Sequence, residues 1–260
     1  MDHRANYGWD APGIMLGFLG AGFGLVGLSL VLIGWHAFAF AMPLGAVAFV
    51  AGIVPLGLGL AMLQYGLAGK MRTRDAMLDL VDWRGDEQVL DIGTGAGLLL
   101  AGAAQRLNQG GHALGIDIWS AKDLSSNSAL ATRRNLVIEG VADRADVLTA
   151  DAARLDFADG AFDVVLSSLC LHNIEPESGR DAACREIARV LKPGGRVVIG
   201  DYLPTHGYAR ILHEAGLEIR QSRPAFAVAR SLMWLLVADK PKGLGGVDTF
   251  RSATAGGVAL

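Results

Sequence analysis

Charged residues and cysteines are both scarce in this sequence. Only 19% of the 260 residues are Asp, Glu, Lys or Arg, whereas 52% are hydrophobic and the mean hydropathy is +0.35. This composition is too apolar for an ordinary soluble domain, so part of the chain is expected to lie in a membrane. The two cysteines, Cys170 and Cys184, form an isolated pair that is expected to be reduced in a cytoplasmic domain.

A basic surface is also lacking. The formal net charge is −3, and no stripe of basic residues with interleaved aromatics occurs along the chain. Such a stripe is the usual electrostatic signature of a protein that binds nucleic acid. Nucleic acid is therefore not expected as a partner.

The lack of charge is concentrated near the N-terminus. From Ala11 to Gly69, a stretch of 59 residues, there is no Asp, Glu, Lys or Arg. A membrane-spanning helix needs about 20 apolar residues, so two spans fit. We place them at Gly13 to Trp35 and Pro43 to Tyr65, joined by "HAFAFAM", so that residues 1–69 form a transmembrane hairpin. A cleaved signal peptide and a hairpin buried in a soluble fold are the alternatives.

Positive charge follows the second span at once, in Lys70, Arg72 and Arg74. Because basic residues favour the cytoplasmic side of a membrane, this end of the hairpin is expected in the cytoplasm. The sequence therefore predicts a multi-pass protein of the cell membrane whose remaining residues form a cytoplasmic domain.

Residues 70–240 alternate between short apolar runs and amphipathic segments, which is typical of an α/β fold with a mostly parallel sheet. An entry helix is predicted near 75–82, because its apolar residues share one helical face. The other helices are predicted at 98–108, 128–139, 178–191 and 206–215. Strands are predicted at 88–92, 112–117, 145–150, 162–168, 196–201, 217–222 and 231–238.

The last two predicted strands are joined by only about eight residues, "RPAFAVAR". A parallel crossover needs a dozen or more residues, so these strands should be antiparallel. Pro193, Gly194 and Gly195 are expected to form a turn between a helix and a strand. Residues 241–260 lack apolar periodicity and are expected to be a flexible tail.

A glycine-rich turn follows the first strand in "VLDIGTGAGLLL". A turn of this kind between a strand and a helix is typical of a nucleotide site. The dinucleotide fingerprint G-x-G-x-x-G/A requires a small residue at position 98, where this chain has Leu98. Asp91, directly before the turn, suits a cationic ligand better than a diphosphate. The stretch therefore argues against a nicotinamide dinucleotide.

Four motifs together resemble the class I S-adenosylmethionine-dependent methyltransferases. They are "VLDIGTGAG", "GIDIW", "TADAARLDFADGAFDVVLSSLCLHNI" and "REIARVLKPGGRVVIGD", in that order. The resemblance covers roughly residues 75–240 and implies a Rossmann-like, doubly wound, mostly parallel sheet of seven strands with an antiparallel last strand. It also implies S-adenosylmethionine as the methyl donor.

The resemblance assigns donor-binding roles residue by residue. Asp91 and the turn glycines Gly93, Gly95 and Gly97 would hold the methionine end of the donor. Asp117 would bind both ribose hydroxyls, and Ile118 would pack on the adenine. Asp151 would accept from the adenine amino group beside the Ala152 backbone, and Ser168 would offer its carbonyl to the donor's ammonium group.

The acceptor side is less specified by the sequence. His172 and Tyr202 are the candidate catalytic residues, because they follow the fourth and fifth strands of the sheet. His172 could equally be part of the scaffold, Cys170 is a weaker nucleophile candidate, and no metal site is expected. The predicted function is methyl transfer by in-line displacement to a small lipophilic acceptor. A non-catalytic membrane protein that binds S-adenosylmethionine as a sensor is the alternative.

Overall fold

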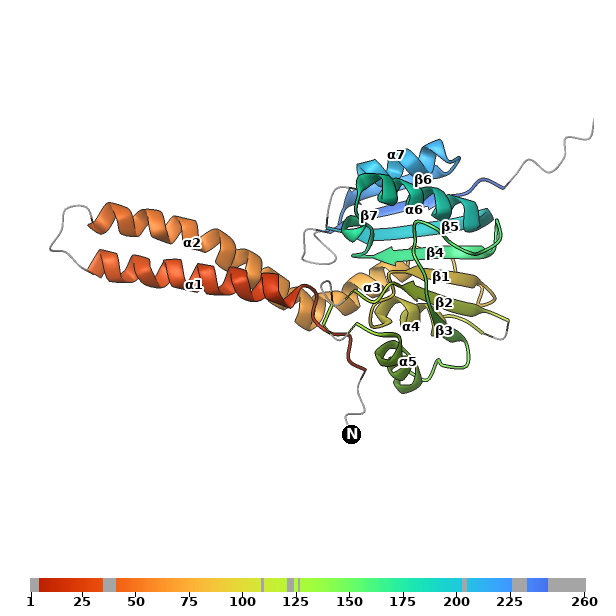
Figure 1. The fold of residues 1–260 in the computed structure, drawn as a ribbon, viewed down its shortest axis with the longest axis horizontal. Helices are drawn as coiled ribbons and strands as arrows, with labels where there is room; N and C mark the ends of the chain where they lie inside the picture. The colour runs from red at the N-terminus through yellow and green to blue at the C-terminus, as the bar shows by residue number, and fades with distance from the viewer. Residues whose placement is uncertain are drawn as a thin grey trace, which may run out of the picture.

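The computed structural model describes residues 5–34, 41–108, 110–120, 124–125, 127–202, 205–225 and 233–242. A pair of long helices projects from a layered α/β domain (Figure 1). Trp35 with most of the predicted link between the spans, and nearly all of the predicted tail, lie outside the described residues.

The projecting pair consists of α1 (Pro12–Gly34) and α2 (Ala41–Gln64). Glycines allow the two helices to pack closely: a Cβ on Gly22 would meet the backbone of Leu56, and one on Gly52 would meet Leu25. Large apolar side chains such as Phe23 point outward, away from any protein core. Both helices are long and apolar enough to cross a bilayer, as the sequence predicts.

α2 ends one residue before the predicted end of the second span, but the helical backbone does not stop there. It continues from α2 through a π-helical turn, Tyr65–Gly69, into α3 (Lys70–Leu78), and the Lys70 N–H bonds to the Tyr65 carbonyl. The predicted separate entry helix near 75–82 is therefore wrong in its bounds. Propagating an existing helix is easier than starting a new one, which accounts for the continuity. We call Tyr65–Gly69 with Lys70 the elbow.

The domain is built on a seven-stranded sheet in the order β3-β2-β1-β4-β5-β7-β6. β7 is antiparallel to both β5 and β6, and the other pairs are parallel, which confirms the predicted topology. The strands are β1 (Gln88–Ile92), β2 (His112–Asp117), β3 (Ala145–Thr149), β4 (Phe162–Ser168), β5 (Leu191–Asp201), β6 (Glu218–Pro224) and β7 (Trp234–Asp239).

β5 begins earlier than predicted. Leu191 already pairs with Phe162, and the register then shifts so that Arg196 pairs with Val164. The predicted turn at Pro193, Gly194 and Gly195 is therefore an irregularity inside β5, with Gly194 at a φ of 82°. Glycine and proline mark strand bulges as well as turns, so the composition alone does not separate the two.

Helices cover both faces of the sheet (Figure 1). α3, α4 (Leu98–Ala104) and α5 (Ala129–Ile138) share one apolar core with the sheet, through side chains such as Met77, Leu100, Leu136 and Val89. α6 (Glu177–Val190) and α7 (His206–Glu214) share the other, with Ile187, Leu212 and Leu90. Adjacent residues Val89 and Leu90 enter opposite cores, as the period of a strand requires.

Gly115 in β2 is a sensitive position in the first core. A Cβ there would lie 2.7 Å from Leu100 Cδ2 and 2.7 Å from the Thr94 hydroxyl. Gly115→Ala should destabilise the domain by about 1–3 kcal/mol through overpacking, measured by urea denaturation. Gly207→Ala in α7 is the matched control, because nothing lies within 4 Å of its Cβ position. Equal effects of the two substitutions would contradict this account.

Candidate active site

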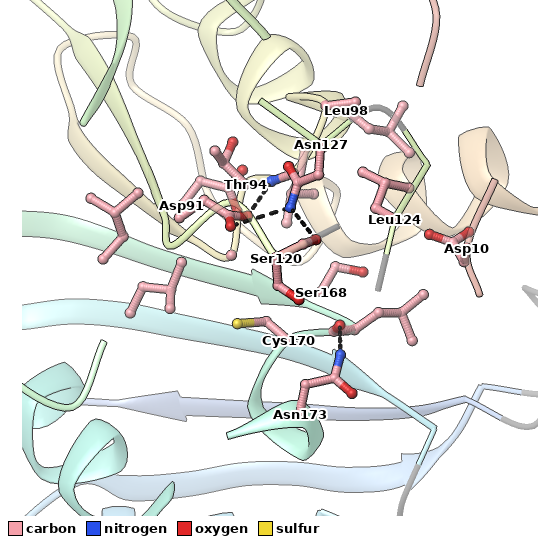
Figure 2. A pocket seen from close by; sticks show the side chains of 18 of the residues that line it. Asp10, Asp91, Thr94, Leu98, Ser120, Leu124, Asn127, Ser168, Cys170 and Asn173 are labelled. Atoms are coloured by element: carbon pink, nitrogen blue, oxygen red, sulfur yellow. Dashed lines mark hydrogen bonds between the residues drawn. The ribbon is translucent and has the colours of Figure 1, made fainter. Parts of the chain in front are cut away.

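The sheet carries a cavity at the carboxyl ends of β1, β2, β3 and β4. Its volume is about 650 Å³, within the range of small-molecule sites. β1 is flanked by β2 on one side and β4 on the other, so the strand order reverses here. Ligands of open α/β sheets bind at such a reversal. Figure 2 shows side chains from several elements facing this space.

Asp91 stands at the floor of the cavity on β1. Its side chain is buried, and its Oδ2 atom has no hydrogen-bond partner among the described residues. Burial, and to a lesser extent the charge of Asp117, raises the pKa of the Asp91 carboxyl to about 7. A buried acceptor without a partner is costly, so this site is suited to a cationic hydrogen-bond donor.

The glycine turn brings backbone against this cavity. Gly93 (φ 70°) and Gly95 (φ 53°) have left-handed conformations that favour glycine, and both line the cavity. A Cβ on Gly93 would collide with the Cys170 side chain. Gly97 (φ 85°) caps α4 and approaches Thr132 of α5, and it is not among the lining residues. Gly97 therefore supports the conformation of the turn without lining the cavity.

Asp117 closes the β2 side of the cavity. Its Oδ2 accepts from the Gly95 N–H at 2.9 Å and its Oδ1 from the Trp119 N–H at 2.6 Å. The Asn127 amide lies 3.4 Å from Oδ1. Ile118 beside it is 67% exposed and lines the cavity. A carboxylate held in this way, next to an uncovered apolar side chain, fits a ribose with an attached base.

The remaining predicted donor residues also reach the cavity. Asp151 and Ala152 line it after β3, and the Asp151 carboxylate accepts from the Ala153 N–H at 2.9 Å. Ser168 lines it at the end of β4. The structure therefore brings every predicted donor residue except Gly97 to one cavity. Asp91, the left-handed glycines and Asp117 fit S-adenosylmethionine, a cationic adenosyl ligand without phosphates.

His172 lies in a 3-10 turn after β4 and lines the same cavity. Its Nδ1 is 2.5 Å from Oδ1 of Asp201, whose side chain is buried. The Asp201 carboxylate also accepts from the His172 and Tyr202 N–H groups at 3.1 and 2.7 Å. This arrangement fixes the imidazole ring, and because a carboxylate only accepts hydrogen bonds, Nδ1 is assigned as the donor.

Tyr202 is placed differently. It is not among the residues that line the cavity, and its ring packs edge-on against Tyr65 and His172, with centroids 6.2 Å apart in each pair. Burial raises the pKa of the Tyr202 hydroxyl well above its usual range. Tyr202 is therefore positioned to support His172 rather than to exchange protons with a ligand.

Sequence reasoning missed a second group of lining residues. Tyr7, Asp10, Tyr65 and Lys70 come from the N-terminal segment and the elbow, and they line the same cavity as Asp91. Asp10 and Lys70 are the charged residues that flank the uncharged stretch on either side. Because the two ends of a helical hairpin lie close together, the position of Asp10 and Lys70 at these ends could have predicted their ion pair.

The state of Asp91 makes donor binding sensitive to pH. Protonated Asp91 cannot attract a cation, so the affinity for S-adenosylhomocysteine should fall as the pH drops below about 7. Asp91→Asn should bind roughly tenfold or more weakly at pH 8 and lose this pH dependence. Isothermal titration calorimetry at several pH values measures both effects.

The raised pKa of Asp91 should also affect the stability of the protein without ligand, and this effect serves as a control. Because the folded pKa lies above the unfolded value of 3.8, Asp91 destabilises the empty protein increasingly as the pH rises from about 4 to 7. Asp91→Asn should therefore unfold at a higher temperature than the unsubstituted protein at pH 8, and the gap should close toward pH 4. A gap that widens in acid would contradict the assignment.

Residues 90–199 match the family model described as a methyltransferase domain. The ubiquinone/menaquinone biosynthesis C-methyltransferase of Vibrio vulnificus is 32% identical over 126 residues, which is 48% of this chain and 45% of that protein. The demethylmenaquinone methyltransferase of Beutenbergia cavernae is 36% identical over 131 residues, 50% of this chain and 46% of that protein. The chain thus spans slightly less than half the length of these curated relatives.

The fold also matches a solved structure. A S-adenosylmethionine-dependent methyltransferase from Aquifex aeolicus superposes with a TM-score of 0.53 at 18% identity, covering 66% of this chain and 91% of that one. At this identity the likeness concerns the fold alone.

Proposed function

We propose that this chain, which carries a class I S-adenosylmethionine-dependent methyltransferase domain, transfers the donor's methyl group to a small lipophilic acceptor. The observation that carries this proposal is the composition of one cavity. The predicted donor residues line it together with His172 and with residues from the base of the apolar hairpin. A ligand that dissolves in a bilayer would find its site next to the helices expected to lie there.

The donor supplies a methyl group already activated by the sulfonium, so positioning carries most of the catalysis. Alignment of two reacting groups is worth up to about 7–11 kcal/mol. Asp91 would hold the ammonium group, Asp117 the ribose hydroxyls and Ile118 the adenine face. Ser168 would contribute its backbone carbonyl. These contacts aim the methyl group at the part of the cavity bounded by His172, for in-line displacement.

His172 would act as the general base when the acceptor arrives protonated. In the neutral imidazole that donates Nδ1–H to Asp201, the Nε2 atom carries no proton and can take one from the acceptor. The buried Asp201 carboxylate fixes the ring orientation and stabilises the imidazolium that forms, as acids do in catalytic triads. Tyr202, packed on the ring, would act as a positioning residue.

The relatives' names suggest the acceptor class. One is named as a C-methyltransferase of ubiquinone and menaquinone biosynthesis, and the other as a methyltransferase of demethylmenaquinone. A quinone-type ring that dissolves in a bilayer is therefore the proposed acceptor. The hairpin is proposed to span the cell membrane, with Lys70, Arg72 and Arg74 on the cytoplasmic side where the donor is made. The acceptor would then reach the cavity from the bilayer.

Methyl transfer in a reconstituted membrane tests this function. The full chain in lipid nanodiscs is incubated with S-adenosylmethionine labelled on the methyl group and an organic extract of bacterial membranes. Label should enter the organic phase and depend on the extract. Binding of the donor without label transfer to the extract or to a panel of phenols and thiols would instead favour the sensor function.

A further inference from the structure

The N-terminal segment contributes Tyr7 and Asp10 to the lining of the cavity. We call residues 5–10 the strap. Its Asn6 exchanges hydrogen bonds of 3.0 and 2.8 Å with the Asn135 side chain of α5, and the Tyr7 hydroxyl donates to Glu139 at 2.9 Å. Trp9 and Ser125 are joined by two hydrogen bonds, at 2.9 and 3.2 Å. The strap is thus fastened to the domain on the side of α5.

The strap is also fastened to the elbow. The Trp9 ring fills the space above Gly66, where a Cβ would lie 2.5 Å from it. The ammonium group of Lys70 donates to the carbonyls of Tyr7 and Gly8, at 3.2 and 2.8 Å, and pairs with the Asp10 carboxylate at 2.9 Å. The strap, the elbow and the domain therefore meet around Lys70.

Donor residues and strap residues occupy different parts of the cavity. Figure 2 shows Asp91 and Asp10 at opposite ends of the labelled side chains, with Asp10 next to Leu124. The donor contacts proposed above use the ends of β1 to β4. What remains of the lining comes mainly from the strap, the elbow, the start of α3 and residues 169–175. α3 contributes Thr73 and Arg74, and Arg74 pairs with Asp75. The acceptor must lie in this remaining part.

The chemistry of this part favours one kind of ligand group. An ammonium group has three N–H donors, and two of those of Lys70 are taken by the Tyr7 and Gly8 carbonyls. The Asp10 Oδ2 atom lies 2.9 Å from the ammonium nitrogen, but it is buried and accepts no hydrogen bond from the described residues. Lys70 also neutralises Asp10, so the pair has little attraction for a further ion. Its carboxylate oxygens can still accept, and a neutral O–H group is the donor that fits. The Tyr7 and Tyr65 side chains alongside suit a flat apolar body.

We propose that the strap and the elbow form the acceptor site, in which the Asp10 carboxylate accepts a hydrogen bond from a hydroxyl group on a lipid-soluble ring. That the bound ring is a methyl acceptor rests on the proposed function, but its binding at this site can be tested independently of methyl transfer. The apolar hairpin would then supply part of the site as well as a membrane anchor.

The test compares two probes, naphthol and its methyl ether. In the ether a methyl group replaces the hydroxyl hydrogen, so the ether cannot donate a hydrogen bond. Their binding to the full chain in nanodiscs with S-adenosylhomocysteine is measured by ligand fluorescence, with empty nanodiscs as the blank. The unsubstituted protein should bind naphthol about tenfold more tightly than the ether. Asp10→Asn should reduce this preference to less than threefold. Asp143→Asn, an exposed carboxylate paired with Arg144, should keep it.

Two further readouts separate the site from a loss of structure. Affinity for S-adenosylhomocysteine should stay within about twofold in Asp10→Asn, which shows that the domain is folded. Tyr7→Phe removes the bond to Glu139 but keeps the ring and should keep the preference for naphthol. Equal binding of both probes to the unsubstituted protein, or an unchanged preference in Asp10→Asn, would overturn the proposal. If the preference holds but no label enters the membrane extract, the proposed function fails and the site stands.

Discussion

His172→Gln should lower the rate of methyl transfer to the membrane extract by roughly 10²–10⁴-fold while leaving the affinity for S-adenosylhomocysteine unchanged. Glutamine keeps a hydrogen bond to Asp201 but cannot take up a proton at neutral pH. The rate is measured in a single turnover with labelled donor, so that product release does not mask the chemical step.

The control for this prediction is Tyr202→Phe. It keeps the ring that packs on His172 and removes a hydroxyl that does not line the cavity, so the rate should change by less than about threefold. If His172→Gln keeps the full rate at every pH, the histidine is part of the scaffold and the acceptor reacts without a protein base at this position.

Asp117→Ala should weaken the binding of S-adenosylhomocysteine by about 10²-fold or more. Two hydrogen bonds from ribose hydroxyls to a carboxylate would be lost, each worth about 1.5–3 kcal/mol. The substitution also frees the N–H groups of Gly95 and Trp119, which the carboxylate holds in the empty protein. The affinity is measured by calorimetry at pH 8, where Asp91 is ionised.

Asp79→Ala is the matched control for Asp117→Ala. Asp79 is exposed and pairs with Arg106 away from the cavity, so its removal should leave the affinity unchanged. Surface pairs of this kind contribute about 0–1 kcal/mol to stability. Unaltered affinity in Asp117→Ala would instead mean that the ribose lies elsewhere, and the assignment of the donor half of the cavity would fail.

The fold was largely predictable because several local signals agreed. Short apolar strands alternated with helices, and the eight residues before the last predicted strand required an antiparallel pair, as β6 and β7 now show. The motif order predicted a methyltransferase domain, and residues 90–199 match a family model of that description. The failures were boundaries: β5 begins at Leu191, and α3 is continuous with the apolar helix before it.

The residues proposed to bind the donor could be gathered at one cavity from the sequence, because they follow directly from the ends of strands. The lining residues of the strap and the elbow could not, because their placement depends on contacts between distant segments. Asp10 and Lys70 are 60 positions apart and meet only because the hairpin returns the chain to its starting point. No periodicity or motif in the sequence predicts the two hydrogen bonds between Asn6 and Asn135. Gly97 is the opposite case: it belongs to the glycine motif, but it packs against Thr132 and does not line the cavity.

The central claim is that this cavity holds an adenosyl methyl donor rather than a dinucleotide. A thermal-shift measurement on the full chain in nanodiscs tests it, because a ligand that binds only the folded state raises the melting temperature. S-adenosylhomocysteine should raise it in the unsubstituted protein and fail to do so in Asp117→Ala, while NAD should have no effect on either. Stabilisation by NAD with none by S-adenosylhomocysteine would contradict the account.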